Sequence, residues 1–274
     1  MRLAVLLLVA AACEAPPDGG WNGEPVTARV MTLNVAGGRT LVDDLRRGEN
    51  LADLLAGAGA DVIALQECAP CDELAALLPP ELALVAPADD GVALLHDAAR
   101  WDVLDTDLVT LGDGDDGWGP RHARRARLEH RATGFVIDAY STHYCVTIRR
   151  PDDACTVERQ LHYTEQLLGE IAARHPPAVL AGDLNVFDGF ARGRVIARLR
   201  SAGLTDALAA AHPDTADDAV TFHGNSWAPP GRVDYIFTPA DVVVLDAAID
   251  DSLPPGDGSD HDAVAADLLL GAAR

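Results

Sequence analysis

The sequence predicts an α/β fold in which two stacked β-sheets are covered on their outer faces by helices. Nine strand-like runs occur in 274 residues, too many for one small sheet. Helical patterns are fewer, and their order along the chain suits helices placed outside the sheets. Hydrophobic residues make up 49% of the chain, which is enough for a sizeable core, so we expect one large domain.

The predicted strands are short apolar runs, several of which stop abruptly at polar residues. In chain order they are Thr27–Asn34, Val62–Gln66, Gly91–Leu95, Arg124–Glu129, Thr133–His143, Ala178–Gly182, Val233–Phe237, Val242–Ile249 and Ala263–Leu269. The chemistry of the chain is therefore concentrated at strand ends.

Four segments have helical patterns. They are Glu49–Ala56, Asp72–Leu78, Thr156–Arg174 and Ala191–Leu199. The third is the clearest, because its apolar residues recur at helical spacing and predict one face that lies on a sheet. Those residues are Val157, Leu161, Leu168 and Ile171.

The N-terminus has the pattern of an export signal. Met1 and Arg2 precede about ten apolar residues, a run too short to span a bilayer as a mature helix. We expect a signal peptide at 1–12, with Cys13 as the lipid-bearing mature terminus of a cell-envelope lipoprotein. Cleavage without lipidation would give a secreted or periplasmic protein with the same terminus. Residues 13–25 are rich in Pro, Gly and acid and are expected to tether the domain at 26–274.

Five cysteines leave four that can pair once Cys13 is set aside, and export makes disulfides permissible. We expect the pairs Cys145–Cys155 and Cys68–Cys71, which is one of three possible arrangements. A zinc site and a redox motif are the alternatives for the C-x-x-C sequence at Cys68.

The formal net charge of −22 opposes loose adhesion to DNA, because non-specific binding depends on Lys and Arg neutralising phosphates. Five arginines nevertheless occur between Arg121 and Arg131. A strand here would place Arg125, Arg127 and Arg131 on one face, either as a phosphate-facing patch or as a solvated face balanced by acids such as Asp113. The acidic segment Gly112–Gly119 is expected to be a flexible linker, with Ca²⁺ binding as the alternative.

Six strand ends carry residues of the kinds that bind phosphate and metal. The residues are Asn34, Glu67, His143, Asp183, Asn185, Asp234, Asp260 and His261. Singly, most have an ordinary interpretation as turn, cap or surface residues. Asp183 and Asn185 stand two positions apart, so in a continuing strand they project from the same face. If the six ends converge on one rim, all these groups face one cleft.

These ends also form a series of motifs, TLNVAG, ALQEC, THY, GDLN, RVDYIF and SDHDAV. These motifs occur in the same order as in the endonuclease/exonuclease/phosphatase superfamily, which the chain resembles over roughly Thr27 to Leu270. The resemblance implies a four-layer α/β/β/α sandwich of two mixed sheets. Two features depart from the family pattern: its usual Asn-Thr-His-Leu is here Ser141 to Tyr144, and the C-x-x-C after Glu67 is not general.

The resemblance assigns Glu67 as the principal metal ligand, with Asn34 and Asp260 nearby. Such oxygen ligands suit Mg²⁺ or Mn²⁺, with Ca²⁺ also possible. Asp183 matches the residue that orients or deprotonates the attacking water, and Asn185 matches the amide that holds the phosphate or that water.

The same resemblance assigns His261 to the scissile phosphate and Asp234 to the acid that hydrogen-bonds it. His143 matches a second histidine, which contacts the phosphate or assists the leaving group. Asn34, Arg125 and Arg127 complete the substrate-binding residues that we expect.

The leading hypothesis is an exported, divalent-metal-dependent phosphoesterase that uses an activated water, with nuclease-like action on phosphodiesters. The alternatives are a phospholipid or inositol-phosphate phosphoesterase of the sphingomyelinase kind, a non-catalytic binding protein on the same fold, and a thiol oxidoreductase using Cys68 and Cys71. The expected partners are a phosphate-ester substrate and a membrane reached through Cys13; no protein partner is implied.

Overall fold

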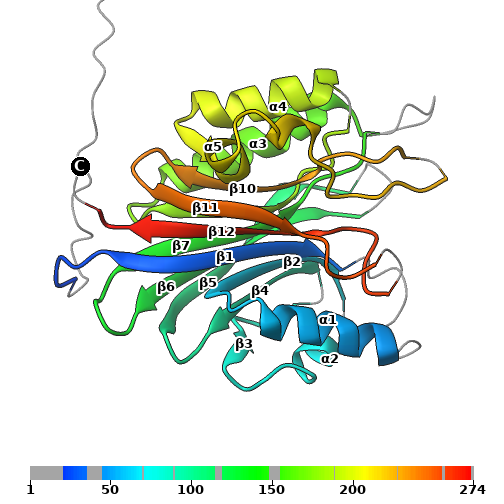
Figure 1. Cartoon of the computed structure of the whole chain (residues 1–274). Coiled ribbons are helices and arrows are strands. Elements are labelled where there is room, and N and C mark those ends of the chain that lie inside the picture. Colours follow the sequence, from blue (N-terminus) through cyan, green and yellow to red (C-terminus); the bar gives the residue numbers. More distant parts are fainter. Residues whose placement is uncertain are drawn as a thin grey trace, which may run out of the picture.

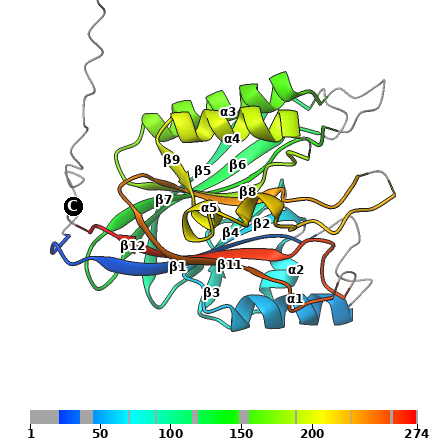
Figure 2. The same cartoon turned by 45° about the horizontal axis from the view of Figure 1, so that its top comes forward.

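The computed structural model describes residues 21–35, 45–69, 71–88, 90–114, 119–147, 155–187, 189–226, 228–254 and 257–272. Two six-stranded sheets are stacked face to face, with helices on their outer surfaces (Figures 1 and 2). This arrangement confirms the predicted sandwich of two mixed sheets. The predicted signal peptide, Cys13 and the tether up to residue 20 lie outside the described residues.

The first sheet has the strand order β11-β12-β1-β2-β4-β3. Its strands are β1 (Val26–Asn34), β2 (Val62–Cys68), β3 (Leu82–Leu84), β4 (Gly91–Asp97), β11 (Val243–Asp250) and β12 (Ala263–Leu270). Parallel pairing of β1 with β2 brings the carboxyl ends of both strands to one edge, where the antiparallel β12 begins.

The second sheet has the order β5-β6-β7-β8-β10-β9. Its strands are β5 (Trp101–Gly112), β6 (Arg121–His130), β7 (Val136–His143), β8 (Ala178–Asp183), β9 (Leu204–Asp206) and β10 (Asp234–Pro239). β7 and β8 are parallel and end side by side, with His143 paired to Asp183, and antiparallel β10 begins at the same edge with Asp234.

Helices cover both outer faces (Figure 1). α1 (Leu45–Gly57) and α2 (Cys71–Ala75) cover the first sheet, whereas α3 (Val157–Ala172) and α4 (Gly189–Ser201) cover the second. The short α5 (Ala207–Ala211) and the 3₁₀ helix η2 (Ala216–Asp218) follow β9. Apolar residues accordingly form one core between the sheets and one under each helical layer.

Strand β1 shows why the central strands are almost continuously apolar. Ala28 and Val30 pack in the core between the two sheets, whereas Met31 and Leu33 pack in the core under the helices of the first sheet. Both faces of such a strand are buried, so no polar face alternates with the apolar one. The apolar run in the sequence therefore reflects burial on both sides of the sheet.

Strand β5 was missed by the sequence analysis. It is an edge strand of twelve residues, most of them partly or fully exposed, and the acidic residues at Asp102, Asp105 and Asp107 hide its pattern. The short β3, β9 and α5 were missed as well, since three to five residues carry little periodicity. The predicted run Thr133–His143 is shorter, because β7 begins at Val136 after a turn.

The predicted apolar face of α3 packs on the second sheet, but it lies to one side of the buried face. Leu168 is buried and Leu161 and Ile171 are partly buried against the core under this helix, whereas the buried positions are Gln160, Tyr163, Thr164, Leu167 and Leu168. Polar residues can occupy this face because they find partners there. Gln160 Nε2 donates to the carbonyl oxygens of Cys145 and Asn185, both at 2.9 Å.

The ordered domain begins before Val26, within the segment predicted as a tether. The ring of Trp21 packs edge-on against Phe135 at 5.2 Å between centroids, and Asn22 N donates to Thr133 O at 2.9 Å. These contacts fix residues 21 and 22 on the domain.

Both predicted disulfides are present, Cys68–Cys71 and Cys145–Cys155. Cys68 and Cys71 are each 1% exposed, which is typical of a structural link and leaves no free thiol for a zinc site. Within the described segments, no helix has the length and apolar character needed to cross a membrane.

Candidate active site

The predicted site residues meet where the strands of both sheets end. Along each strand the residues that face the other sheet change from apolar to polar toward this edge. In β1 the series runs from Val30 through Thr32 to Asn34, and in β8 it runs from Ala181 to Asp183. The site is thus the polar end of the space between the sheets.

A buried layer of hydrogen bonds separates this site from the apolar core. Thr32 Oγ1 donates to Gln66 Oε1 at 3.2 Å, and Gln66 Nε2 donates to Ser141 Oγ at 3.1 Å. Ser141 Oγ in turn donates to Leu65 O at 2.9 Å. These bonds connect β2 of one sheet with β7 of the other, so the two halves of the site are held at a fixed separation.

Asp183 lies at the centre of the site and is 1% exposed. Asn34 Nδ2 donates to Asp183 Oδ2 at 3.0 Å and also to Glu67 Oε1 at 3.1 Å. The Nε2 atom of His143 is 3.5 Å from Asp183 Oδ2, and that of His261 is 4.0 Å from it. One carboxylate therefore faces an amide and two imidazoles.

His261 is held by Asp234 through a hydrogen bond of 2.9 Å from Nδ1 to Oδ2. The carboxylate accepts from Nδ1, which leaves Nε2 directed to Asp183 and to Asp260 Oδ1, 3.9 Å away. Ser259 Oγ donates to Asn34 O at 2.5 Å and accepts from His261 N at 3.0 Å, which fastens the loop of His261 to the end of β1.

Two of the site residues have left-handed backbone conformations, which are uncommon for residues other than glycine. Glu67 has φ +54° and lies at an irregularity in the pairing of β2 with β4. Asn185 has φ +50°. Because such conformations are unfavourable in isolation, the surrounding structure must hold them, and both occur at a residue with a predicted role in chemistry.

The prediction that Asp183 and Asn185 share a strand face was wrong, although the two residues do contact each other in space. β8 ends at Asp183, and the turn that follows lets Asn185 N donate to Asp183 Oδ1 at 2.8 Å. Asn185 Nδ2 donates to Tyr144 O at 3.0 Å, and its own carbonyl accepts from Gln160. A turn, rather than strand alternation, brings the amide to the site.

Burial and neighbouring charges together set the protonation states of the central groups. Burial raises the pKa of Asp183 to about 7, and the neighbouring Asp234 adds to the rise. Burial alone would lower the pKa of His261, but the carboxylates of Asp234 and Asp183 outweigh it and raise this pKa to about 10. Burial, together with the charges of Arg121 and His261, holds the pKa of His143 well below its ordinary value. At neutral pH His261 is cationic and His143 is neutral.

A model of the Endonuclease/Exonuclease/phosphatase family matches residues 31–261. This range includes every site residue described above, from Asn34 to His261. The chain belongs to this family. Members of the family are metal-dependent phosphoesterases, and this chain is therefore a phosphoric ester hydrolase that depends on a divalent metal ion. No curated protein matches the chain.

Solved structures of the family share this fold. An endonuclease/exonuclease/phosphatase from Bacteroides vulgatus is 22% identical, with a TM-score of 0.71 over 89% of this chain and 99% of that one. D. rerio TDP2 in complex with a single-strand DNA product is 17% identical, with a TM-score of 0.69 over 88% and 98%. A mannosyl-6-phosphatase from Bacteroides thetaiotaomicron is 18% identical, with a TM-score of 0.66 over 88% and 99%. At these identities the likeness concerns the fold alone.

Two sets of side chains in this family member have the chemistry to hold a cation. Asp183, Asp234 and His261 place one ligand atom each within 4.8 Å of one another. Glu67 and Asp260 form the other set, and their side chains are 39% and 42% exposed. Asn34 is hydrogen-bonded both to Glu67 on β2 and to Ser259, which precedes Asp260. An ion in the first set would compete with the Asp234–His261 hydrogen bond and face a cationic imidazole. The second set offers open carboxylates and fits a hard, partly hydrated ion better.

Arg125 and Arg127 do not lie in the site, so their predicted role in substrate binding was wrong. Both project toward the outer, helix-covered face of the second sheet, because the intervening Ala126 and the following Leu128 face the other sheet. Arg125 is 1% exposed and pairs with Asp105 and Asp138, and Arg127 pairs with Asp138 at 2.9 Å. The acids that balance these arginines belong to neighbouring strands, not to the segment around Asp113.

Other residues of the site escaped the sequence analysis. Arg121, at the start of β6, is the arginine whose charge acts on His143. Thr221 Oγ1 accepts from the backbone N–H of Val233 and Asp234, at 3.0 and 3.1 Å, and so supports the start of β10. The ring of Phe222 packs on His261 with centroids 4.9 Å apart. The sequence TFHGN before RVDYIF was a usable signal, since it is an apolar and polar cluster that no predicted element contained.

Proposed function

We propose that this protein is an exported phosphoesterase that hydrolyses phosphodiester or phosphomonoester bonds by direct attack of an activated water, with nuclease-like action on diesters as its main activity. The observation that carries the proposal is the position of Asp183. This buried acid lies within 4.0 Å of two histidines in different protonation states, and hydrogen bonds from Asn34 and Asn185 fix both of its oxygens. Such an arrangement suits proton transfer beside an anion.

Glu67, Asn34 and Asp260 are the residues that would hold Mg²⁺ or Mn²⁺ in this proposal. Their carboxylate and amide oxygens are the ligands that such ions take in proteins, and the exposure of the two carboxylates leaves room for retained waters. When bound, the ion would neutralise the non-bridging oxygens of the phosphate and favour ionisation of water.

Asp183 is the group that we assign to the attacking water. Its pKa of about 7 suits a base that works near neutral pH, because the ionised form is available and still binds a proton. The two hydrogen bonds on the carboxylate keep it from rotating. Asn185, placed by the turn after β8, is assigned to the phosphate or to the same water.

His261 is assigned to the scissile phosphate as a cation. Asp234 both fixes the ring at Nδ1 and raises the pKa, so that Nε2 keeps its proton and donates to a phosphate oxygen. His143 is neutral and its Nε2 lies 3.5 Å from the same oxygen of Asp183, which suits a second contact to the phosphate or to the leaving oxygen. The two histidines thereby have different roles on one anion.

Two observations bear on the substrate. The similar fold of D. rerio TDP2, whose structure contains a single-strand DNA product, supports a nuclease-like reaction. The net charge of −22 and the pairing of Arg125 and Arg127 with acids favour a small substrate or a chain end over a long duplex. A phosphomonoester or a phospholipid headgroup is therefore the second candidate, and a mannosyl-6-phosphatase with the same fold supports it.

Export, and attachment to a membrane at Cys13, are part of the proposal. The apolar run after Arg2 and the cysteine at its end support them, and the two disulfides are what an oxidising compartment allows. Cell fractionation with labelled fatty acid tests this, using the wild type and Cys13→Ser. Label and membrane association that persist in Cys13→Ser would contradict the anchor.

A substrate panel tests the reaction itself. It spans DNA, RNA, abasic DNA, sphingomyelin and inositol phosphates, each with Mg²⁺, Mn²⁺, Ca²⁺ or a chelator. We expect turnover that the chelator abolishes and that Mg²⁺ or Mn²⁺ restores, with a diester preferred. Turnover that is equal with and without chelator would contradict the assignment of Glu67 to a metal, and turnover of no substrate would favour a non-catalytic binding protein.

A further inference from the structure

A second histidine–aspartate pair lies beside the pair formed by His261 and Asp234. His223 and Asp262 are 2.8 Å apart, from Nε2 to Oδ1; the side chain of Asp262 is 6% exposed and that of His223 is 30% exposed. Phe222 and His261 form an antiparallel bridge between the two segments. His223 N donates to Asp260 O at 3.0 Å, which places His223 at a fixed position relative to His261.

The contact with Asp262 determines which atom of His223 is available. A carboxylate only accepts hydrogen bonds, so Nε2 carries the hydrogen and donates it. In the neutral ring Nδ1 is then an acceptor. Within the described part of the chain no hydrogen bond to this atom is formed, and the ring is partly exposed. A hydroxyl group of a ligand is a donor that fits this acceptor.

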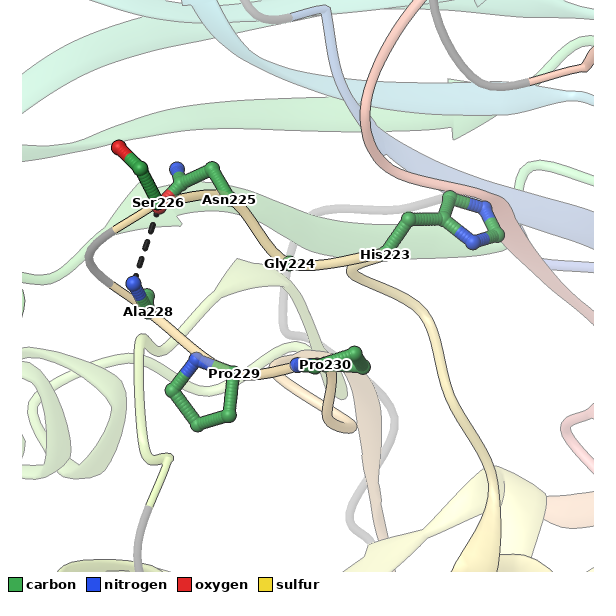
Figure 3. Close-up of a pocket in the computed structure, with 7 residues that line it drawn as sticks. All are labelled: His223, Gly224, Asn225, Ser226, Ala228, Pro229 and Pro230. Atoms are coloured by element: carbon green, nitrogen blue, oxygen red, sulfur yellow. Dashed lines mark hydrogen bonds between the residues drawn. The ribbon is translucent and has the colours of Figure 1, made fainter.

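His223 lines a pocket of about 430 Å³ formed by one loop, with residues 223–226 along one arm and 228–230 along the other (Figure 3). The loop is held in shape by its own hydrogen bonds: Asn225 N donates to Ala228 O at 2.9 Å, and Ala228 N donates to Asn225 Oδ1 at 3.0 Å. Gly224 has φ +83°, and a Cβ there would come within 2.8 Å of Pro230 N. A pocket shaped in advance loses little entropy when a ligand binds.

The lining combines polar atoms with apolar ring faces. Asn225 and Ser226 lie on one side, and Pro229 and Pro230 present their rings on the other (Figure 3). A sugar ring has the complementary character, with hydroxyl groups around its edge and C–H groups on its faces. A pocket of this kind fixes the orientation of a ligand with a few polar groups.

We propose that this pocket binds the sugar that is esterified to the scissile phosphate, and that His223 Nδ1 accepts a hydrogen bond from one of its hydroxyl groups. The inference rests on the proposed phosphoester hydrolysis, since a phosphate at His261 brings its ester group next to Phe222 and His223. A nucleotide and a sugar phosphate both supply this chemistry. Asp262 is a positioning residue that keeps the tautomer of His223.

The simpler interpretation is that His223 and Asp262 only fasten the loop of His261. Loss of such a fastening would slow the hydrolysis of every substrate equally. Loss of a sugar contact would instead change the ratio between substrates with and without a sugar. The two interpretations therefore differ in a measurable preference.

The experiment uses two matched substrate pairs with the metal-loaded full-length protein. The diesters are thymidine 5′-(4-nitrophenyl phosphate) and methyl 4-nitrophenyl phosphate, and the monoesters are a hexose 6-phosphate and phenyl phosphate. We expect His223→Ala to lower the preference for the sugar-bearing member of at least one pair by about fivefold, mainly through KM, which is the effect of one hydrogen bond between neutral groups. The pair that responds identifies a nucleotide or a sugar phosphate as the source.

Asp262 supplies the second readout. Asp262→Asn keeps an oxygen that accepts from Nε2 and should retain the preference, whereas Asp262→Ala should lose it. His175→Ala, at an exposed histidine after α3, is the control for replacing an imidazole. Preferences that stay within about twofold of the wild type in both pairs, a margin well inside the effect of one hydrogen bond, or equal losses on both members, would overturn the inference. A wild type that turns over none of these esters would instead overturn the proposed function, and the sugar pocket with it.

Discussion

Two clusters of charged side chains, each with buried members, lie on opposite faces of the second sheet, and they differ in how their charges are balanced. On the outer face, Arg125 and Arg127 share Asp138, and Arg125 also pairs with Asp105. Positive and negative groups are equal in number there. The site on the inner face has acids at Glu67, Asp183, Asp234 and Asp260, and its described cations near neutral pH are His261 and Arg121.

The difference indicates what each cluster does. A balanced set of ions satisfies its own partners and has no need of a ligand, so the outer cluster holds strands β5, β6 and β7 together. The inner cluster keeps an excess of negative charge, and its member Glu67 and the adjoining Asn185 have unfavourable backbone conformations. Such an excess is tolerated where a metal ion is bound, and strain of this kind is common at functional sites.

The largest expected effect separates catalysis from stability in the inner cluster. We expect Asp183→Asn to lower kcat/KM by about 10²–10⁴-fold, the range for loss of a general base. The unfolding temperature should not fall, because a raised pKa means that the fold disfavours the ionised carboxylate that the amide replaces. Steady-state kinetics and thermal unfolding with chelator measure the two quantities. A parallel loss of both would show that Asp183 has a structural role.

The reverse result is expected in the outer cluster. Arg125→Met leaves Arg127 as the only partner of Asp138 within this cluster. We therefore expect the free energy of unfolding to fall by an amount near the lower end of the roughly 3–5 kcal/mol for a broken buried pair. Activity per folded molecule should stay as in the wild type, since Arg125 is outside the site. The matched control is Arg131→Ala, whose pair with Asp102 has side chains about half exposed and should contribute less than about 1 kcal/mol. Denaturant unfolding measures the two stability losses. A fall in kcat/KM for Arg125→Met would contradict the conclusion that Arg125 lies outside the site.

The sequence predicted the inner cluster far better than the outer one. Each site residue is next to a strand end, and convergence of the ends follows from the parallel pairing of β1 with β2 and of β7 with β8. For Arg125, the alternation of side chains along the strand correctly placed it on the same face as Arg127. It did not show whether that face points to the other sheet or to the helices. That choice depends on the tertiary packing of Ala126 and Leu128 between the sheets.

Residues outside regular strands were predicted least well. The adjacency of Asp183 and Asn185 was expected from strand alternation, but it arises from a turn with a left-handed Asn185. Thr221 and His223 belong to a loop with no periodicity, and their partners Asp234 and Asp262 are distant in sequence. Contacts of this kind are set by the loop as a whole and not by a local pattern.

The last expected effect is a loss of stability between about pH 4 and 7 that comes from the inner cluster, because the pKa of Asp105 in the outer cluster is lowered by Arg125 and acts at lower pH. The pKa of Asp183 is raised from 3.8 to about 7 in the fold, so its protonated form stabilises the folded protein at low pH. That contribution is lost as the pH rises from about 4 to about 7. In the presence of chelator, we therefore expect the unfolding temperature of Asp183→Asn to rise relative to the wild type across this range.

The raised pKa of His261 acts in a different window. Its cationic form contributes stability that is complete below pH 6.5 and is lost as the pH rises through about 10, so it does not mask the effect of Asp183 between about pH 4 and 6. Asp107→Asn, at a half-exposed residue on β5, is the control for replacing a carboxylate. A difference between Asp183→Asn and the wild type that is constant from about pH 4 to 7 would mean that Asp183 is ionised throughout. In that case the unbalanced charge of the inner cluster would already be compensated by the protein itself.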